Sequence, residues 1–453
     1  MVSINAGNPR RKGGQVLQVV FSHYNFNMTK TITLLTSGTR GDVVPYIALG
    51  LGLRDAGYNV RIAAPIGFAS LVETSGLTFA PYEGNPSDLM FEQGDESPLT
   101  IGSNFVNSIR ATRNFIRQAR PLYRRILHTA AEACRGSDLL IYGLPTIWGA
   151  HIAEGLRIPA VRAVLQPLAP TREFSSTLLP FRFSFFGIGN WFTHWAVTQA
   201  TWLSWRSEIN HARHADFGLG GAQWTDPTLQ AFSRQPLTLN GFSEQIVSRP
   251  QDWNEKQVIT GYWRESGVEQ LAVREFERQA ARLQRFIDSS PNSISIGFGS
   301  PGTKGIAVKI LEEALNISSA RAVLTIPAKW HGEIKSKNIF PIEYAPHDWL
   351  YRHVRVAVHH GGAGTTSASL HAGIPTITMP LAIDQFFWGE RIYKIGAGPK
   401  PIPQRALNAK KLADAIRESL KDETMRAKAK TISVRLVTEN GIQAAVSLIR
   451  ALV

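Results

Sequence analysis

Short apolar runs that end in glycine-rich turns recur along this chain, and each is followed by a stretch with helical spacing. The first run covers residues 31–36 and ends at Gly38, and a second run follows at 59–63. Pro45 near the start of the intervening stretch and Gly57 just past its end are expected at the two ends of a helix. The pattern predicts a βαβ unit with parallel strands and a right-handed crossover.

The same alternation continues through the rest of the sequence. Residues 105–135 have a basic helical pattern, and apolar runs at 138–142 and 159–165 predict two further buried strands. The pattern becomes loop-like at 242–253, alternation restarts at 258–261, and after a helix a strand is predicted at 293–297. The second half then repeats the order of strand, glycine-rich turn and helix, which predicts a second α/β unit.

Two doubly wound α/β domains are therefore predicted, at residues 29–249 and 250–453. Residues 1–28 lack periodicity, and we interpret them as a disordered tail or an overcalled start. Parallel sheets of this kind bind ligands at the carboxyl ends of their strands, so two facing domains predict a cleft between them.

Residues 181–205 are unusually rich in phenylalanine and tryptophan, with Arg182 as the only charge before Arg206. Asparagine, threonine and histidine make this stretch too polar to cross a bilayer. Three interpretations stay open: a helix packed into the core, a helix that covers a ligand pocket, and a helix at a membrane interface.

Composition changes this picture only in part. Hydrophobic residues make up 43% and charged residues 19%, as in an ordinary globular protein. The net charge of +14 favours an anionic partner such as a nucleotide phosphate, but no nucleic-acid-binding motif accompanies it, so we expect no nucleic acid. The single cysteine, Cys134, excludes an internal disulfide and fits a cytoplasmic location.

The strongest chemical signal is the segment VAVHHGGAGTTSASL at residues 356–370. A buried strand leads into glycines that allow close backbone approach, and the amides that open the next helix form an anion site. His359 or His360 can donate to a phosphate. The turn residues that can contribute amides or hydroxyls are Gly361, Gly362, Gly364, Thr365 and Thr366.

Two further turns follow predicted strands. Asp384 and Gln385, in PLAIDQ, place a carboxylate beside a carboxamide, a pair that can bond the vicinal hydroxyls of a sugar. An N-cap role for Asp384 is the alternative. Ser300, in GFGS, can donate to a distal phosphate.

These segments together resemble the sterol glucosyltransferase branch of the UDP-glycosyltransferase superfamily. The similar segments are 38–53, 260–263, 297–300 and 346–403, in the order of that branch and over both domains. The resemblance implies the GT-B fold, in which two Rossmann-like domains face each other. It also implies that the N-terminal domain binds the acceptor, that the C-terminal domain binds a UDP-sugar co-substrate, and that no metal or other cofactor is needed.

The resemblance also assigns roles to residues. His359, Ser300 and the turn at 361–366 would hold the diphosphate, and Asp384 with Gln385 the sugar. Tyr344 and Ala345 would contact the nucleobase, and Asp42 would be the catalytic base. A helix cap or a salt bridge to Arg40 is the alternative role for Asp42. Trp191, Trp195 and Trp202 are the acceptor-side candidates.

We therefore expect inverting transfer of a hexose, glucose by resemblance, from a UDP-sugar to a hydroxyl of a sterol-like, lipid or other apolar acceptor. Peripheral contact with the inner face of a membrane is part of this expectation. A natural-product transferase of the polyketide or glycopeptide type, using a UDP- or TDP-deoxysugar, is one alternative. A non-catalytic sugar-nucleotide-binding or membrane-adaptor protein is the alternative of another class.

Overall fold

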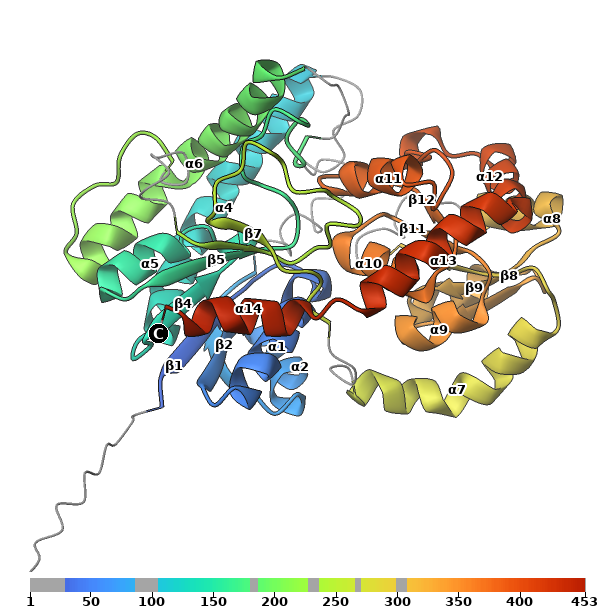
Figure 1. The fold of residues 1–453 in the computed structure, drawn as a ribbon, viewed down its shortest axis with the longest axis horizontal. Helices are drawn as coiled ribbons and strands as arrows, with labels where there is room; N and C mark the ends of the chain where they lie inside the picture. The colour runs from blue at the N-terminus through green and yellow to red at the C-terminus, as the bar shows by residue number, and fades with distance from the viewer. Residues whose placement is uncertain are drawn as a thin grey trace, which may run out of the picture.

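The computed structural model describes residues 29–85, 105–179, 186–226, 236–264, 270–298 and 308–452. Two parallel sheets, each covered by helices, form two lobes (Figure 1). The predicted fold class, two doubly wound α/β units, is confirmed. The predicted tail at 1–28 lies outside the described residues.

The first lobe is built on a seven-stranded sheet in the order β3-β2-β1-β4-β5-β6-β7. Every neighbouring pair is parallel. The strands are β1 Thr31–Leu35, β2 Asn59–Pro65, β3 Thr78–Tyr82, β4 Leu139–Tyr142, β5 Ala160–Val164, β6 Thr238–Asn240 and β7 Gln257–Ile259. The helices are α1 Arg40–Asp55, α2 Ala69–Thr74, α4 Phe105–Ala133, α5 Gly149–Leu156 and α6 Ile188–Phe217.

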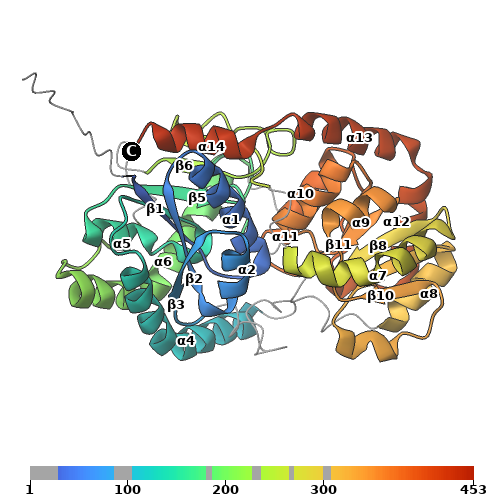
Figure 2. The ribbon, with the colours of Figure 1, turned by 90° about the horizontal axis from the view of Figure 1, so that it is seen from below.

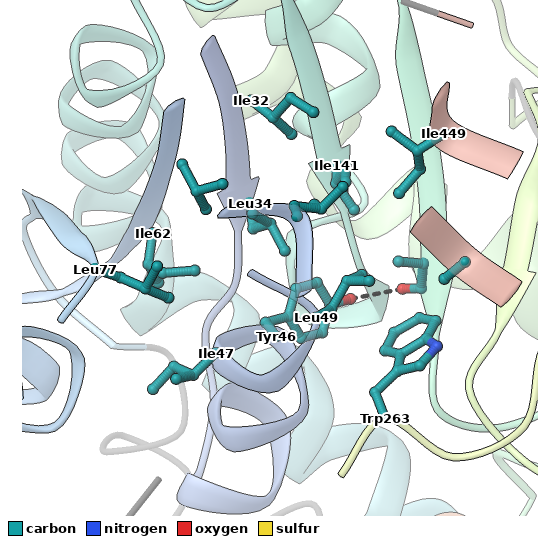
Figure 3. Close-up of a cluster of buried hydrophobic side chains, with 14 of the residues drawn as sticks. Ile32, Leu34, Tyr46, Ile47, Leu49, Ile62, Leu77, Ile141, Trp263 and Ile449 are labelled. Atoms are coloured by element: carbon teal, nitrogen blue, oxygen red, sulfur yellow. Dashed lines mark hydrogen bonds between the residues drawn. The ribbon is translucent and has the colours of Figure 1, made fainter. Parts of the chain in front are cut away.

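Alternate residues of these strands fill two separate cores, one on each face of the sheet. Ile32 and Leu34 pack with α1 on one face, whereas Leu35 packs with α4, α5 and α6 on the other. Figure 3 shows the first core, in which the Tyr46 hydroxyl donates to the Ala163 carbonyl oxygen at 2.6 Å. The Trp263 ring meets the Tyr46 ring edge-on, with centroids 6.1 Å apart.

The second lobe carries a five-stranded parallel sheet in the order β10-β9-β8-β11-β12. Its strands are β8 Ser293–Gly297, β9 Arg321–Thr325, β10 Ile339–Ile342, β11 Ala357–His359 and β12 Thr376–Thr378. Its helices are α7 Gln270–Asp288, α8 Val308–Ser318, α9 His347–His353, α10 Ala363–Ala372, α11 Gln385–Lys394, α12 Ala409–Lys421 and α13 Glu423–Val437. Figure 2 shows these elements gathered on one side of the molecule.

The two lobes do not divide at residue 250, where the sequence placed the boundary. Strand β7 still belongs to the first sheet, so that sheet continues past the predicted position. The last helix, α14 Gly441–Arg450, leaves α13 and lies beside α1 of the first lobe (Figure 1). The fit is close, because a Cβ on Gly52 would lie 2.1 Å from Ile442 Cγ2.

A shared apolar core joins the lobes. It combines Phe242 and Trp253 from the first lobe with Leu370, Phe387 and Trp388 from the second. The ring centroids of Phe242 and Trp388 are 6.0 Å apart. Large apolar side chains packed in this way hold the two sheets in a defined relative position.

The aromatic segment forms most of the 30-residue helix α6, and its side chains divide into two groups. Trp202 and Trp205 are buried against α4 and α5, whereas Phe186, Ile188, Trp191 and Phe192 are exposed. Residues 181–185 of the segment lie outside the described residues. Within the described part of the chain, no helix is long and apolar enough to span a membrane.

Candidate functional site

The turn between β1 and α1 is held in an uncommon conformation. Gly38 has φ +107°, and a Cβ at this position would lie 2.5 Å from Asp42 Oδ2. Asn85 fixes the turn from outside, because its Oδ1 accepts from the Gly38 amide at 3.2 Å and its Nδ2 donates to the Gly38 carbonyl at 2.9 Å. Only glycine fits both the backbone angle and the adjacent carboxylate.

Asp42 lies in the first turn of α1, beneath this loop. Its Oδ2 accepts from the Thr39 amide at 2.8 Å and from the Thr39 hydroxyl at 2.9 Å. The N-cap residue of α1 is Thr39, so the alternative that Asp42 is itself the N-cap is wrong; Asp42 is the third helical residue and bonds back to Thr39 in a capping box. Among the described residues, no hydrogen bond falls on its other oxygen, Oδ1, so the cap leaves one oxygen uncommitted.

Burial raises the pKa of the Asp42 carboxyl, and the two bonds from Thr39 oppose that shift. Desolvation disfavours the charged form of a carboxylate, whereas donors stabilise it. A carboxylate with a raised pKa is a stronger proton acceptor than an ordinary aspartate. The geometry and the pKa direction are therefore compatible with a general base.

The turn between β11 and α10 has the geometry expected of an anion site. Gly361 has φ +91°, and a Cβ there would lie 2.9 Å from the carbonyl oxygen of Gln385. Gly362 is the N-cap residue of α10, so the amides of the first helical turn, from Ala363 on, have no partner within the helix. Gly364 is exposed and Thr365 partly exposed at this turn, whereas Thr366 is buried.

The two histidines at the end of β11 have different surroundings. His359 is fully buried, its Nδ1 accepts from the Gly361 amide at 2.9 Å, and its Nε2 lies 3.4 Å from Ser369 Oγ. This ring therefore supports the turn from inside. His360 is partly exposed, and among the described residues its buried Nδ1 has no hydrogen-bond partner.

The segment after β12 is also conformationally constrained. Ile383 has φ +53°, a strained value for a β-branched residue. Asp384 is the N-cap residue of α11, and its Oδ2 accepts from Trp388 Nε1 at 2.9 Å. Gln385 Oε1 accepts from the amides of Leu381 at 2.8 Å and Ala382 at 3.2 Å, so the amide group orders the loop that precedes it.

The structure brings most of the predicted site residues together. The contact between Gly361 and the Gln385 backbone joins the two turns of the second lobe, and α10 contacts α1 of the first lobe. Tyr344 and Ala345 follow β10 at the same edge of the second sheet, and Ala345 is buried. Ser300 lies outside the described residues.

A cavity of about 590 Å³ lies in the first lobe, between the sheet and helices α5 and α6. Its wall includes Tyr142 of β4, Arg162 of β5 and Trp202 of α6. Trp191 and Trp195, the other two tryptophans predicted on the acceptor side, are not part of this wall. Within the described part of the chain, no group of three or more histidine, cysteine or acidic residues is arranged to hold a metal ion.

Two family models and several curated proteins are similar to this chain. The glycosyltransferase family 28 N-terminal domain matches residues 32–175, and the erythromycin biosynthesis protein CIII-like C-terminal domain matches residues 309–446. A sterol 3-beta-glucosyltransferase of Debaryomyces hansenii is 34% identical over 440 residues, which cover 92% of this chain and 26% of that protein. One of Aspergillus terreus is 33% identical over 442 residues, covering 94% and 30%.

Over most of its length the chain is similar to members of the sterol glucosyltransferase branch of the UDP-glycosyltransferase superfamily. The resemblance drawn from the sequence motifs is thereby confirmed. This chain spans between a quarter and about a third of the length of these branch members, 26% and 34% for those of D. hansenii and Eremothecium gossypii.

Solved structures confirm the GT-B architecture. The glycotransferase of kitacinnamycin superposes with a TM-score of 0.66 at 16% identity, over 94% of this chain and 99% of that one. The glycosyltransferase SsfS6 of Streptomyces sp. SF2575, solved with thymidine diphosphate, gives a TM-score of 0.58 at 17% identity, over 93% and 99%. At these identities the likeness concerns the fold alone.

Three features of the site were not predicted from the sequence. His360 was weighed against His359 but not selected, because two adjacent histidines at a strand end carry no signal of which ring turns inward. Asn85, which clamps the β1–α1 turn, stands 47 residues from Gly38 and had no local signal. Arg162 did have a local signal, since a charged residue in the apolar run PAVRAVL is unusual for a buried strand.

Proposed function

We propose that this chain transfers a hexosyl group, glucosyl by its branch, from a UDP-sugar to a hydroxyl of a sterol-like acceptor, with inversion. The observation that carries the proposal is the contact between α1, which bears Asp42 in its first turn, and α10, which bears the anion-binding turn. In this proposal the contact between the two helices sets a proton acceptor opposite a leaving-group site, across the two lobes.

The proposed chemistry is a single displacement. The acceptor hydroxyl attacks the anomeric carbon while Asp42 Oδ1 takes its proton, and the bond from that carbon to the diphosphate breaks. The electron pair leaves with UDP. An alcohol is far less acidic than an aspartic acid, so the proton transfers as the new C–O bond forms rather than before it.

The leaving UDP gains negative charge, and we propose that the 361–366 turn and the α10 dipole stabilise it. Of the two histidines, His360 is the better candidate for a direct bond to the diphosphate, since both His359 nitrogens already face protein atoms. Burial lowers the pKa of His360 to about 4, so the ring is neutral and donates through its N–H. Ser300, Tyr344 and Ala345 remain proposed donor contacts.

We propose Asp384 and Gln385 as the residues that hold the donor sugar. Asp384 Oδ2 is oriented by Trp388 Nε1, and the Gln385 carbonyl is engaged by the preceding loop. The Gln385 amide nitrogen is then the group that can donate to a sugar hydroxyl. No step in this scheme uses a metal ion, and activity in the presence of a chelator tests that feature.

Peripheral membrane contact is a further part of the proposal. Phe186, Ile188, Trp191 and Phe192 are exposed where α6 begins, and Trp195 stacks on Phe192 with centroids 5.5 Å apart. Aromatic residues of this kind favour the interfacial region of a bilayer. Co-sedimentation with sterol-containing vesicles tests it, because replacing Trp191 and Phe192 by serine should abolish sedimentation and leave turnover of a dispersed acceptor unchanged.

The deciding experiment measures UDP release from UDP- and TDP-sugars with sterol, lipid and polyphenol acceptors. Release that requires a UDP-sugar and a sterol supports the proposal. Release with soluble aglycones and TDP-deoxysugars would favour the natural-product alternative, and donor binding without turnover would favour a non-catalytic protein. The same protein should remain in the cytoplasmic fraction, or on its membranes, after cell fractionation.

A further inference from the structure

The cavity behind the first sheet contains a charged side chain without a hydrogen-bond partner. Arg162 lies in the middle of β5, is only 9% exposed and lines the cavity. Among the described residues its guanidinium makes no hydrogen bond, and its Nε is fully enclosed. A buried arginine usually pairs with an anion, since leaving a buried charge unpaired is costly.

Two more donors face the same space. Arg213 Nη1 donates to His151 Nδ1 at 2.9 Å, and arginine cannot accept, so the proton of the neutral His151 ring is on Nε2. Burial lowers the pKa of His151 to about 4, which keeps that ring neutral. Neither His151 Nε2 nor the hydroxyl of Tyr142 has a hydrogen-bond partner among the described residues, and both residues line the cavity.

The charges around the cavity are mixed, and they do not satisfy Arg162 directly. Glu154 is already engaged by Arg213, with oxygen–nitrogen distances of 2.5 and 2.9 Å. Asp226 is buried and also lines the cavity. Burial raises the pKa of Tyr142 to about 12, so its hydroxyl stays protonated and can donate.

The rest of the wall is apolar and suits a bulky ligand. Leu168, Leu178 and the Trp202 ring contribute to it, and Trp202 is fixed by stacking on His151 with centroids 5.3 Å apart. Tyr142 is paired with Leu35, the last residue of β1, so this side of the cavity lies at the sheet edge from which the Asp42 turn begins. An apolar body with one oxygen-bearing end would match this arrangement.

We propose that the cavity binds the body of the acceptor and that Arg162, with His151 and Tyr142, bonds an acidic group of that acceptor. A carboxylate is the best fit, because its two oxygens match the fork of a guanidinium. The inference rests on the proposed transferase activity in one respect, namely that the ligand of the cavity is the acceptor. Binding of the ligand in the cavity does not itself depend on turnover. It narrows the acceptor from a sterol-like alcohol to an amphipathic acid with a hydroxyl.

The test uses three steroid alcohols that differ only in the end of the side chain: a hydrocarbon, a methyl ester and a carboxylate. The acceptor KM of the wild-type protein should be about tenfold to a hundredfold lower for the carboxylate than for the hydrocarbon, as expected for a charge-assisted hydrogen bond. Arg162→Met should remove that advantage. It should not lower Tm, because no hydrogen bond is lost and a buried charge is removed. Arg135→Met, which removes an exposed guanidinium paired with Glu132, is the matched control and should keep the preference.

Calorimetric titration of the carboxylate without donor separates this inference from the proposed function. Binding that Arg162→Met abolishes, in a protein that turns over none of the three acceptors, would sustain the cavity assignment and refute the transferase activity. Turnover with no preference for the carboxylate would support the transferase activity and refute the cavity assignment. A preference that survives Arg162→Met, or a large fall in Tm showing a structural role, would overturn the inference. If Arg162→Met does not fold, the wild-type preference among the three acceptors still decides it.

Discussion

Replacing Asp42 by asparagine should separate the capping role of this residue, which the structure shows, from its proposed role as the catalytic base. The side chain caps α1 through Oδ2, which accepts from the amide and the hydroxyl of Thr39. Asparagine keeps a carbonyl oxygen that can accept both bonds, but it cannot take a proton. The substitution therefore preserves the cap and removes the base.

The expected loss in kcat is about a hundredfold to ten-thousandfold, the range for removal of a general base. At about 1.36 kcal/mol per factor of ten, this equals roughly 2.7 to 5.4 kcal/mol of transition-state stabilisation. The donor KM should stay within about twofold, because Asp42 does not belong to the donor lobe. UDP release at saturating donor and acceptor measures both quantities.

Protein stability gives an independent readout. The raised pKa of Asp42 means that the folded state holds the proton more tightly than the unfolded chain. Its favourable contribution is complete below the unfolded pKa, about 3.9, and is lost as the pH rises through the folded pKa. At neutral pH the carboxylate is therefore a cost, so Asp42→Asn should not lower Tm. Asp42→Ala, which also loses the cap, should be less stable by about 1 kcal/mol.

Asp55→Asn is the matched control, since Asp55 is an exposed aspartate at the other end of the same helix, paired with Arg54. It should leave kcat unchanged. The acidic limb of the wild-type kcat/KM profile should lie above the ordinary aspartate pKa and be absent in Asp42→Asn. An Asp42→Asn protein with full activity and unchanged Tm would refute the assignment of Asp42 as the base.

The other predictions concern the donor lobe. His360→Ala should raise the donor KM about tenfold, the value of one hydrogen bond to a charged group, with little change in Tm. His359→Ala should instead mainly lower Tm. Calorimetry and donor titration distinguish the two variants, and the reverse result would restore His359 as the phosphate ligand. Gly361→Ala should cost at least 1 kcal/mol of stability and weaken UDP binding, because a Cβ meets backbone at 2.9 Å and φ is +91°. Trp388→Phe keeps an apolar ring but loses the bond to Asp384, so the donor KM should rise several-fold while UDP alone binds as before. Incubation with EDTA should leave turnover unchanged, and a reversible loss would contradict metal-independent leaving-group stabilisation.

The features that sequence patterns predicted correctly are local in the chain. The Gly38 and Gly361 turns follow strands directly, so a glycine after an apolar run was enough to place them. The proposal that Asp384 and Gln385 act together rests only on their adjacency in the sequence, and their sugar-binding role stays a prediction. Each of these features lies within about ten residues of the strand that positions it, and short-range periodicity carries that information.

The features that the sequence did not predict depend on contacts between distant segments. Strand β7 and helix α14 return to the first lobe after the loop-like stretch and after the second domain, and nothing in their own residues states which sheet they join. Likewise, β11 is buried on both faces, so alternation along AVHH could not show which histidine turns inward.

The donor-sugar residues are connected to the contact between lobes through one side chain. Trp388 donates to Asp384 Oδ2, and its ring packs against Phe242 of the first lobe. The neighbouring Phe387 ring lies 5.4 Å from Phe174, also of the first lobe, and the Arg391 guanidinium covers both rings at 5.0 Å. A change in the relative position of the lobes would therefore move the indole that orients Asp384. Because the same rings pack between the lobes and orient the carboxylate that we propose binds the sugar, we expect sugar binding to be coupled to the relative position of the lobes.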